Sequence, residues 1–196
     1  MSAASDLERC IAGGGVALFP ADTVYGLACD PESKAAVERI YEIKGRPPER
    51  PAAVMFFELG DALAALPWLG ARTRAAFEHL LPGPFTLIVP NPERRFPLAC
   101  GPVPEKLGVR VPDVPLLREV RVPVLQSSAN PSGGADARRL ADVDAGIRAQ
   151  VDLEVDGGEL PGTPSTVVDL GEYESGGEPT ILREGAVAAA EVRRLL

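Results

Sequence analysis

The 196-residue sequence contains no apolar stretch that is long enough to cross a membrane as a helix. Apolar runs such as "AAVMFF" at 52–57 fall far short of the roughly 18 residues that a helical span needs, so we expect this run to lie in a core. The opening "MSAASDLERC" carries acidic residues and no apolar segment, which argues against a secretory leader. We therefore expect a cytoplasmic protein without a membrane partner, folded as a single domain over residues 1–196.

Histidine and cysteine are scarce. His79 is the one histidine, and the three cysteines, Cys10, Cys29 and Cys100, lie far apart without a C-x-x-C pair. A structural zinc site usually needs about four such ligands, so no bound metal is expected. We expect the cysteines to be buried thiols in a reducing compartment, and His79, near the end of a predicted helix, to have no functional role.

Lysine is also scarce, and the overall charge is negative. The chain has three lysines, a formal net charge of −8 and a calculated isoelectric point near 4.8. Domains that bind nucleic acid usually present a basic face, because phosphate contacts supply most of their affinity. We therefore expect no stable nucleic-acid binding, although a local basic pocket for a small anion remains possible.

Several common catalytic motifs are absent. The sequence has no G-x-x-x-x-G-K-[ST], which excludes a standard P-loop, and its "GGG" at 13–15 precedes a predicted strand instead of following one. It has no G-x-S-x-G, and with a single histidine a Ser-His-Asp triad has little support.

Hydrophobic periodicity and turn residues predict a mixture of helices and strands. Because "FTLIVP" and "LGVRVP" follow each other as strands, we expect one mixed sheet covered by helices and not a strictly alternating fold. Gly45 is the expected end of the second helix. We predict helices at 5–12, 32–43, 60–65, 71–80, 139–149 and 187–195, and strands at 16–20, 52–57, 85–90, 107–112, 122–126, 151–155, 165–170 and 179–183. The acidic segment 170–180 is expected to be a flexible hairpin tip.

The segment "KGRPPERP" at 44–51 concentrates positive charge in an otherwise acidic chain. If the chain is extended after Gly45, the side chains of Lys44 and Arg46 can converge on one side. A guanidinium can contact phosphate or carboxylate in a bidentate manner, and the prolines reduce the entropy lost on ordering the loop. The segment is therefore either a solvated turn or a rigid binding site for an anion.

Three further stretches combine small or hydroxylated residues with tight turns. "PADTVYGLACD" at 20–30 follows a strand and reads as a connection into the next helix, with Gly26 allowing close approach of a ligand. "QSSANPSGGADARR" at 126–139 could hold an anion with backbone N–H groups and hydroxyls, or be a plain loop. The third is "GTPSTVVDL" at 162–170 together with "ILREG" at 181–185. If these loop ends face one cavity, Lys44, Arg46, Arg110 and Arg183 would form a cationic, hydroxyl-lined site for a nucleoside triphosphate and a small polar co-substrate.

Taken together, these motifs resemble a known family. "FPADTVYGL", "KGRPPERP", "LLPGPFTLIVP", "GVRVPD", "SSANPSGG", "STVVDL" and "LREG" occur in the order typical of YrdC-like proteins of the bacterial TsaC type, from about residue 12 to 187. The pairing of K-x-R with a distant S-x-N is specific to that family. The resemblance implies an α/β fold in which a YrdC-like twisted open mixed sheet, flanked by helices, surrounds a central positively charged cleft.

The resemblance also implies an activity, namely that of a nucleotidyltransferase. Such enzymes condense L-threonine, bicarbonate and ATP to threonylcarbamoyl-AMP and pyrophosphate for the threonylcarbamoyladenosine modification of tRNA. Mg²⁺ would arrive with ATP, and contact with other tRNA-modification proteins would be transient. The family pattern assigns catalysis to Lys44, Arg46, Ser128 and Asn130. It assigns ATP binding to these four with Arg50 and Arg183, and threonine binding to Thr23, Tyr25, Arg110 and Ser165.

Five positions depart from the family pattern, and their effect on the substrate contacts is left open: Ala21, Arg50, Met55, Gln126 and Asp136. Two alternatives therefore stand beside the synthase. One is a YrdC-like paralogue that binds nucleotide or RNA without efficient synthase activity, and the other is a non-catalytic binding module for a nucleotide or another anion. Pyrophosphate release that depends on threonine would favour the synthase.

Overall fold

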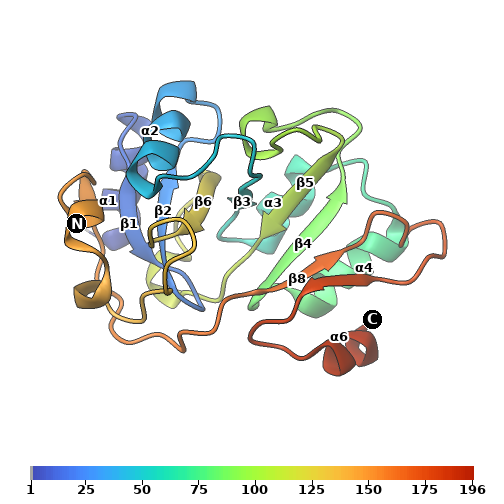
Figure 1. Cartoon of the computed structure of the whole chain (residues 1–196). Coiled ribbons are helices and arrows are strands. Elements are labelled where there is room, and N and C mark those ends of the chain that lie inside the picture. The colour runs from blue at the N-terminus through green and yellow to red at the C-terminus, as the bar shows by residue number, and fades with distance from the viewer. Residues whose placement is uncertain (1) are drawn as a thin grey trace.

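The computed structural model describes residues 2–196. The elements follow one another as α1 (Ala3–Ala12), β1 (Ala17–Pro20), β2 (Tyr25–Cys29), α2 (Lys34–Lys44), β3 (Ala53–Met55), α3 (Leu59–Ala65), α4 (Ala71–Leu80), β4 (Phe85–Pro90), η1 (Pro97–Ala99), β5 (Lys106–Arg110), η2 (Pro115–Leu117), β6 (Val124–Ser128), η3 (Leu140–Asp142), α5 (Ala145–Arg148), β7 (Leu153–Glu154), β8 (Thr166–Asp169), β9 (Thr180–Arg183) and α6 (Ala189–Leu195). Figure 1 shows their arrangement.

Within the described residues, the strands form one nine-stranded sheet in the order β7-β1-β2-β6-β3-β5-β4-β8-β9. The pairs β1–β7, β3–β5 and β4–β8 are parallel, and the remaining pairs are antiparallel. This confirms the expectation of a twisted open mixed sheet flanked by helices.

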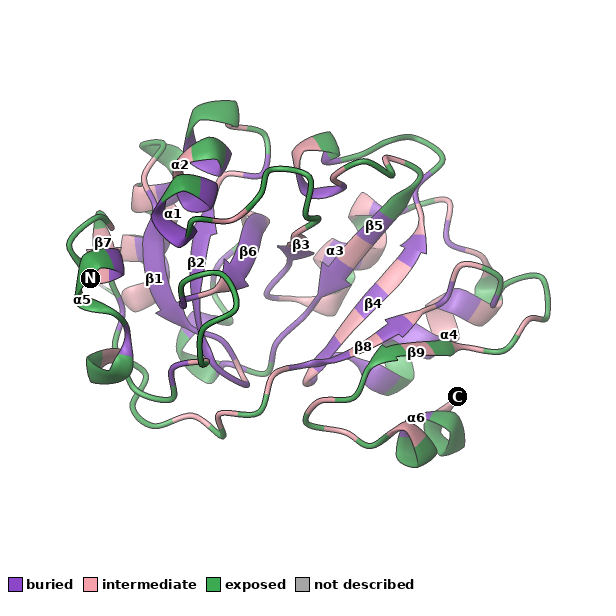
Figure 2. Cartoon of the chain, viewed as in Figure 1, coloured by how far each residue is buried: buried purple, intermediate pink, exposed green. Residues whose placement is uncertain are grey.

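The half of the sheet that contains β1 and β2 is buried on both faces. All residues of these strands are buried, a pattern expected of strands covered on two sides. Leu18 and Leu27 share a core with the apolar side of α2, whereas Phe19 and Ala28 share a second core with α1. Figure 2 shows these strands as the most uniformly buried part of the chain.

The other half of the sheet leaves one face partly open. Along β4, Phe85, Leu87 and Val89 are buried, while Thr86 and Ile88 between them are only partly covered. Side chains alternate between the two faces of a strand, so Thr86 and Ile88 face away from the core. This difference in cover between the two halves creates room for a cleft.

The predicted elements are largely recovered, with two corrections. The stretch 20–30 is not a connection to a helix, because Tyr25–Cys29 forms strand β2 between β1 and β6. The predicted helix at 139–149 is two short pieces, η3 and α5. The segment 170–180 is the tip of the hairpin formed by β8 and β9, as expected. Within it, Glu174 accepts hydrogen bonds from the backbone and hydroxyl groups of Thr73 at the start of α4, both at 2.8 Å.

None of the helices formed by residues 2–196 is both long and apolar enough to cross a membrane.

Candidate functional site

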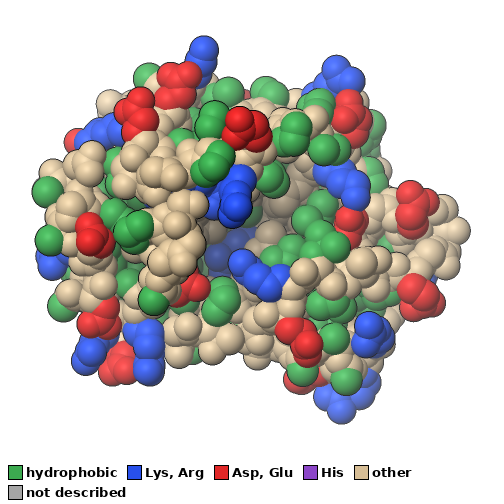
Figure 3. Space-filling view, viewed as in Figure 1, with side chains coloured by type: hydrophobic (Ala, Val, Ile, Leu, Met, Phe, Trp, Pro, Cys, Tyr) green, Lys and Arg blue, Asp and Glu red, His purple; other side chains and the backbone are tan. Residues whose placement is uncertain are grey.

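A cleft of about 420 Å³ lies on the partly open face of the sheet. Its basic lining residues are Arg46, Lys106, Arg110 and Arg183. Hydroxyl groups come from Thr23, Thr86, Ser127, Ser128 and Ser165, and apolar surface from residues such as Ile88, Val103 and Val167. Figure 3 shows Lys and Arg side chains gathered around a central hollow beside apolar surface. The cleft can therefore receive an anion together with an apolar group.

The basic loop enters the cleft at Arg46. Helix α2 ends at Gly45, whose φ of 56° lies in the left-handed region and reverses the chain direction. Arg46 then lines the cleft, and its Nη2 donates to the carbonyl of Pro51 at 2.6 Å. Its Nε is buried and has no hydrogen-bond partner among residues 2–196. A guanidinium has five N–H groups and the bond to Pro51 uses one, so Arg46 keeps donors for a ligand in the cleft that it lines.

Lys44 does not line the cleft, in contrast to the expectation that its side chain converges with that of Arg46 on one site. The ammonium is 3% exposed and donates to three oxygens: the carbonyl of Ser128, the carbonyl of Asn130 at 2.7 Å and Oδ1 of Asn130 at 3.0 Å. An ammonium has three N–H groups, so these acceptors use all of them. Lys44 therefore lies behind the cleft and holds the S-x-N segment in place.

Burial lowers the pKa of the Lys44 ammonium to about 8. The positive charge of Arg46 contributes to this lowering of the pKa, while Asp136 opposes it. The desolvation of a charged group and a neighbouring like charge both disfavour the ionised form of a lysine.

The S-x-N segment is ordered by its own side chains as well. Ser128 Oγ donates to Asn130 Oδ1 at 2.6 Å, and Asn130 Nδ2 donates to the carbonyl of Gly134 at 2.5 Å. Ser128 lines the cleft, but Asn130 is buried behind it. Asn130 therefore orders the loop that presents Ser128 and is not among the residues that line the cleft.

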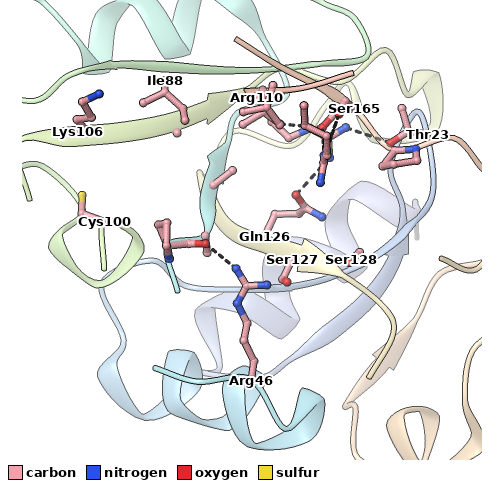
Figure 4. A pocket seen from close by; sticks show the side chains of 18 of the residues that line it. Thr23, Arg46, Ile88, Cys100, Lys106, Arg110, Gln126, Ser127, Ser128 and Ser165 are labelled. Atoms are coloured by element: carbon pink, nitrogen blue, oxygen red, sulfur yellow. Dashed lines mark hydrogen bonds between the residues drawn. The ribbon is translucent and has the colours of Figure 1, made fainter. Parts of the chain in front are cut away.

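Arg110 forms the floor of the cleft. Its Nη2 donates to Asp22 Oδ1 at 2.6 Å and to Thr23 Oγ1 at 3.3 Å, and its Nη1 donates to Gln126 Oε1 at 3.3 Å. Figure 4 shows Arg110, Thr23 and Ser165 across the cleft from Arg46. Burial lowers the pKa of Arg110, with Asp22 opposing the shift and Arg183 adding to it, and burial raises the pKa of Asp22, with Arg110 opposing the shift. The guanidinium is therefore a fixed, partly neutralised cation.

Ser165 and Arg183 form the wall beside the floor. Arg183 donates to the carbonyl of Ser165 through Nε at 3.2 Å and Nη2 at 2.8 Å, and Nη2 also reaches Ser165 Oγ at 3.2 Å. Strand β9, which carries Arg183, pairs with β8 directly after Ser165. The two residues thus reach the cleft from adjacent strands as one unit.

Besides Lys44 and Asn130, two more of the predicted site residues lie outside the cleft lining. Tyr25 is fully buried, and its hydroxyl contacts Asp156 Oδ1 at 3.0 Å and the carbonyl of Gly158 at 2.9 Å. Arg50 is exposed, and its carbonyl accepts from Tyr41 Oη at 2.6 Å. Tyr25 therefore tethers the segment that leads to Ser165, and the structure offers no support for Arg50 as a contact within the cavity.

The cleft thus brings together six of the predicted site residues, whereas four lie outside its lining among the described residues. The six are Thr23, Arg46, Arg110, Ser128, Ser165 and Arg183, and the four are Tyr25, Lys44, Arg50 and Asn130. Of the departures from the family pattern, Ala21 and Met55 are buried in the core, while Gln126 and Asp136 line the cleft.

The sequence did not single out Lys106 or Thr86, although both line the cleft. Lys106 pairs with Asp169 at 2.6 Å. Strand alternation was the available signal: counting back in twos from Arg110 reaches Lys106, and Thr86 is an inner residue of a predicted strand.

The site does not supply a metal-binding cluster of its own. In the part of the chain that the structure describes, no group of three or more His, Cys, Asp or Glu side chains could hold an ion. The acidic residue in the cleft lining is Asp136. A Mg²⁺ ion commonly takes one or two carboxylates, with substrate phosphates and water completing its shell, so a phosphate-borne ion fits this donor set.

Comparison with known families identifies the same region. A family model named Sua5/YciO/YrdC, described as telomere recombination, matches residues 9–185. A threonylcarbamoyl-AMP synthase of Chromohalobacter salexigens is 36% identical over 180 residues, which are 87% of this chain and 94% of that protein. A protein of the same name from Pseudomonas aeruginosa is 36% identical over 172 residues, covering 83% and 89% respectively.

Solved structures share the fold. Pyrococcus abyssi Sua5 complexed with L-threonine has a TM-score of 0.86 at 28% identity, and the match covers 97% of this chain and 56% of that one. The present chain therefore spans little more than half of the Sua5 chain. Escherichia coli YciO has a TM-score of 0.79 at 27% identity, covering 93% and 89%.

Proposed function

The chain belongs to the Sua5/YciO/YrdC family, and on this basis we propose that it is an L-threonylcarbamoyladenylate synthase. It condenses L-threonine, bicarbonate and ATP to threonylcarbamoyl-AMP and pyrophosphate, as a nucleotidyltransferase. The observation that carries the proposal is the convergence of Arg46, Ser128, Arg110 and Arg183 in one cleft. Relatives that match most of this chain bear the name of that enzyme.

The reaction requires anions to meet. The amine of threonine and bicarbonate form a carbamate with loss of water, and a carbamate oxygen then attacks the α-phosphate while the bond to pyrophosphate breaks. Arg46 and Arg183 offset the repulsion between these anions and stabilise the charge that develops on pyrophosphate. Lys44 and Asn130 act from behind by fixing the loop that presents Ser128.

Threonine lies at the floor and wall of the cleft in this proposal. Arg110 receives the carboxylate, with Thr23 and Ser165 beside it. Asp22 and Gln126 hold the guanidinium in position, so the cation does not need to reorganise when the substrate arrives. Side chains for general base catalysis are not required once the carbamate has formed.

The remaining parts of the proposal follow from the activity. Mg²⁺ enters with ATP and supplies charge neutralisation at the phosphates. The product passes to other tRNA-modification proteins through transient contacts in the cytoplasm, and the acidic chain does not itself hold tRNA.

A second candidate is a family member that binds nucleotide without efficient synthase activity. Two departures from the family pattern, Gln126 and Asp136, line the cleft and so bear on this candidate. Threonine dependence of the chemistry separates the two, because only the synthase consumes threonine.

The direct test is pyrophosphate release from ATP in the presence of threonine and bicarbonate. We expect release to require all three substrates. We expect Arg46→Ala to lose on the order of 2–4 kcal/mol of transition-state stabilisation, because one cation facing the developing charge is removed. Arg50→Ala, at an exposed residue of the same loop, is the matched control. Release that is absent, or independent of threonine, would refute the proposal.

A further inference from the structure

Thr86 is a cleft residue without an assigned role. It lies on β4, an inner strand held by β5 on one side and β8 on the other. Its neighbours along the strand, Phe85 and Leu87, are buried on the opposite face, so the side chain of Thr86 is directed to the cleft. The position of the hydroxyl is therefore fixed by the sheet and not by a mobile loop.

Thr86 forms a hydroxyl pair with Ser165. The two oxygens, Thr86 Oγ1 and Ser165 Oγ, are 2.8 Å apart, and Arg183 Nη2 lies 3.2 Å from Ser165 Oγ. A guanidinium can only donate, so it uses one lone pair of Ser165. One hydroxyl of the pair donates to the other. Whichever one donates, the pair keeps one O–H donor and at least one free acceptor lone pair.

The surroundings of this pair suit a small side chain that bears both a hydroxyl and a methyl group. Val167 lies beside Thr86 on β8 and also lines the cleft, which provides apolar surface. On the other side, Leu87 pairs with Val109, so Thr86 and Arg110 occupy the next positions on neighbouring strands. Adjacent strands are about 5 Å apart, a span that one amino acid can bridge from carboxylate to side-chain hydroxyl.

We propose that Thr86 is a specificity-determining residue that recognises the side-chain hydroxyl of the amino-acid substrate through its pair with Ser165. The inference rests on the proposed function, because it places the carboxylate of that substrate at Arg110. A hydroxyl ligand can both donate and accept, so it satisfies both free positions of the pair. An isosteric ligand with a methyl group in place of the hydroxyl leaves them unsatisfied, and sites built to bind a hydroxyl reject such analogues strongly.

The test compares threonine with valine in the full-length protein. Dissociation constants for threonine and inhibition constants for valine are measured for wild type, Thr86→Val and Thr86→Ser. We expect T86V to weaken threonine binding roughly 3- to 10-fold, the effect of one neutral hydrogen bond. Valine binding should be unchanged or tighter, and T86S should restore the affinity for threonine.

The controls separate recognition from folding. A non-hydrolysable ATP analogue should bind T86V and wild type equally, and Thr180→Val, at an exposed position on β9, should change neither ligand. Equal losses for threonine and valine, unchanged threonine binding, or an effect confined to the ATP analogue would each overturn the inference. If T86V does not fold, the test uses T86S, which keeps the hydroxyl. The ratio of its threonine affinity to its valine affinity should equal the wild-type ratio, and a changed ratio would overturn the inference. A wild-type chain that does not bind threonine would overturn the proposed function as well.

Discussion

Lys44 and Arg46 are two residues apart in sequence and have different roles in the structure. Gly45 turns the chain so that Lys44 faces the buried side of the S-x-N segment while Arg46 faces the cavity. The ammonium donates its three N–H groups to Ser128 and Asn130, so in the proposed function it acts on a phosphate only through its charge and through the geometry of the loop. The guanidinium of Arg46 lines the cleft and donates to the carbonyl of Pro51, which leaves it further N–H groups for direct contacts.

The pKa of Lys44, about 8 because of burial, predicts a pH dependence. We expect kcat/KM for ATP to fall as pH rises through about 8, since deprotonation removes a positive charge behind the cleft. The pH dependence of stability has the opposite sign. Between the lowered pKa of Lys44 and the ordinary lysine pKa, the unfolded chain binds more protons at this group than the folded chain does, so the contribution of Lys44 to the free energy of unfolding rises with pH. Lys44→Met should remove this pH dependence both from kcat/KM for ATP and from the free energy of unfolding. A wild-type kcat/KM that does not change as pH rises through about 8 would contradict the assignment of this pKa to Lys44.

Asp22 and Arg110 form a buried ion pair that has an exposed counterpart of equal length. Both Asp22–Arg110 and Asp113–Arg118 measure 2.6 Å, but the first pair is 7% and 4% exposed and the second is 57% on both sides. We expect Asp22→Ala to cost about 3–5 kcal/mol of unfolding free energy because it leaves a buried charge unpaired. Asp113→Ala should cost less than about 1 kcal/mol. Denaturant unfolding measures the loss of unfolding free energy in both variants. Similar losses would show that burial does not determine how much the Asp22–Arg110 pair contributes to stability.

At the scale of elements, two loops pack against each other to form the wall that carries Arg46. The backbone N–H of Ala52 donates to the carbonyl of Ala99 at 2.9 Å, which joins the basic loop to the segment before β5. Gly101 has a φ of +59°, and a Cβ there would lie 2.6 Å from the carbonyl oxygen of Glu49. The close approach of the two backbones therefore requires glycine.

Gly101→Ala should displace the basic loop. The left-handed conformation alone costs a residue with a Cβ roughly 1–2 kcal/mol, and the contact with Glu49 adds to this. We expect weaker binding of an ATP analogue together with a lower melting temperature. Gly14→Ala is the matched control, because Gly14 has a φ of +75° but nothing within 4 Å of its Cβ position. If the two variants bind the ATP analogue equally, the displacement caused by the clash at Gly101 does not extend to Arg46.

The sequence predicted the elements with strong periodicity and missed those that depend on tertiary partners. Strand β2 contains Gly26 and small residues, and it exists because β1 and β6 pair with it on both sides. Likewise, K-x-R and S-x-N could be identified as motifs, but the direction of Lys44 depends on carbonyl groups 84 and 86 residues away. Local patterns carry no information about such distant acceptors.

At the scale of the whole molecule, charge is separated between the cleft and the remaining surface. The chain carries a net charge of −8, yet four basic side chains line one cavity. Most other arginines that form ion pairs do so at the surface, as Arg94 does with Glu105 and Arg148 with Glu154. Small anions can therefore bind in the cleft, while a long polyanion would also meet the acidic exterior.

This distribution predicts that the protein does not bind tRNA stably. In a mobility-shift experiment at physiological salt we expect no complex, because non-specific affinity depends on many phosphate contacts. An ATP analogue should bind the same preparation, which establishes that the cleft is intact. A tRNA complex that dissociates steeply with added salt would contradict this prediction.

Strand β3 contributes only Ala53–Met55, yet it joins β6 on one side to β5 on the other. The two halves of the sheet are therefore connected through β3, and the loop that carries Arg46 leads directly into this strand. Arg183 lies on the far half. A ligand that contacts both arginines at once would bridge the two halves of the sheet across this short strand. The two halves should therefore move less relative to each other as the fraction of ligand-bound protein increases.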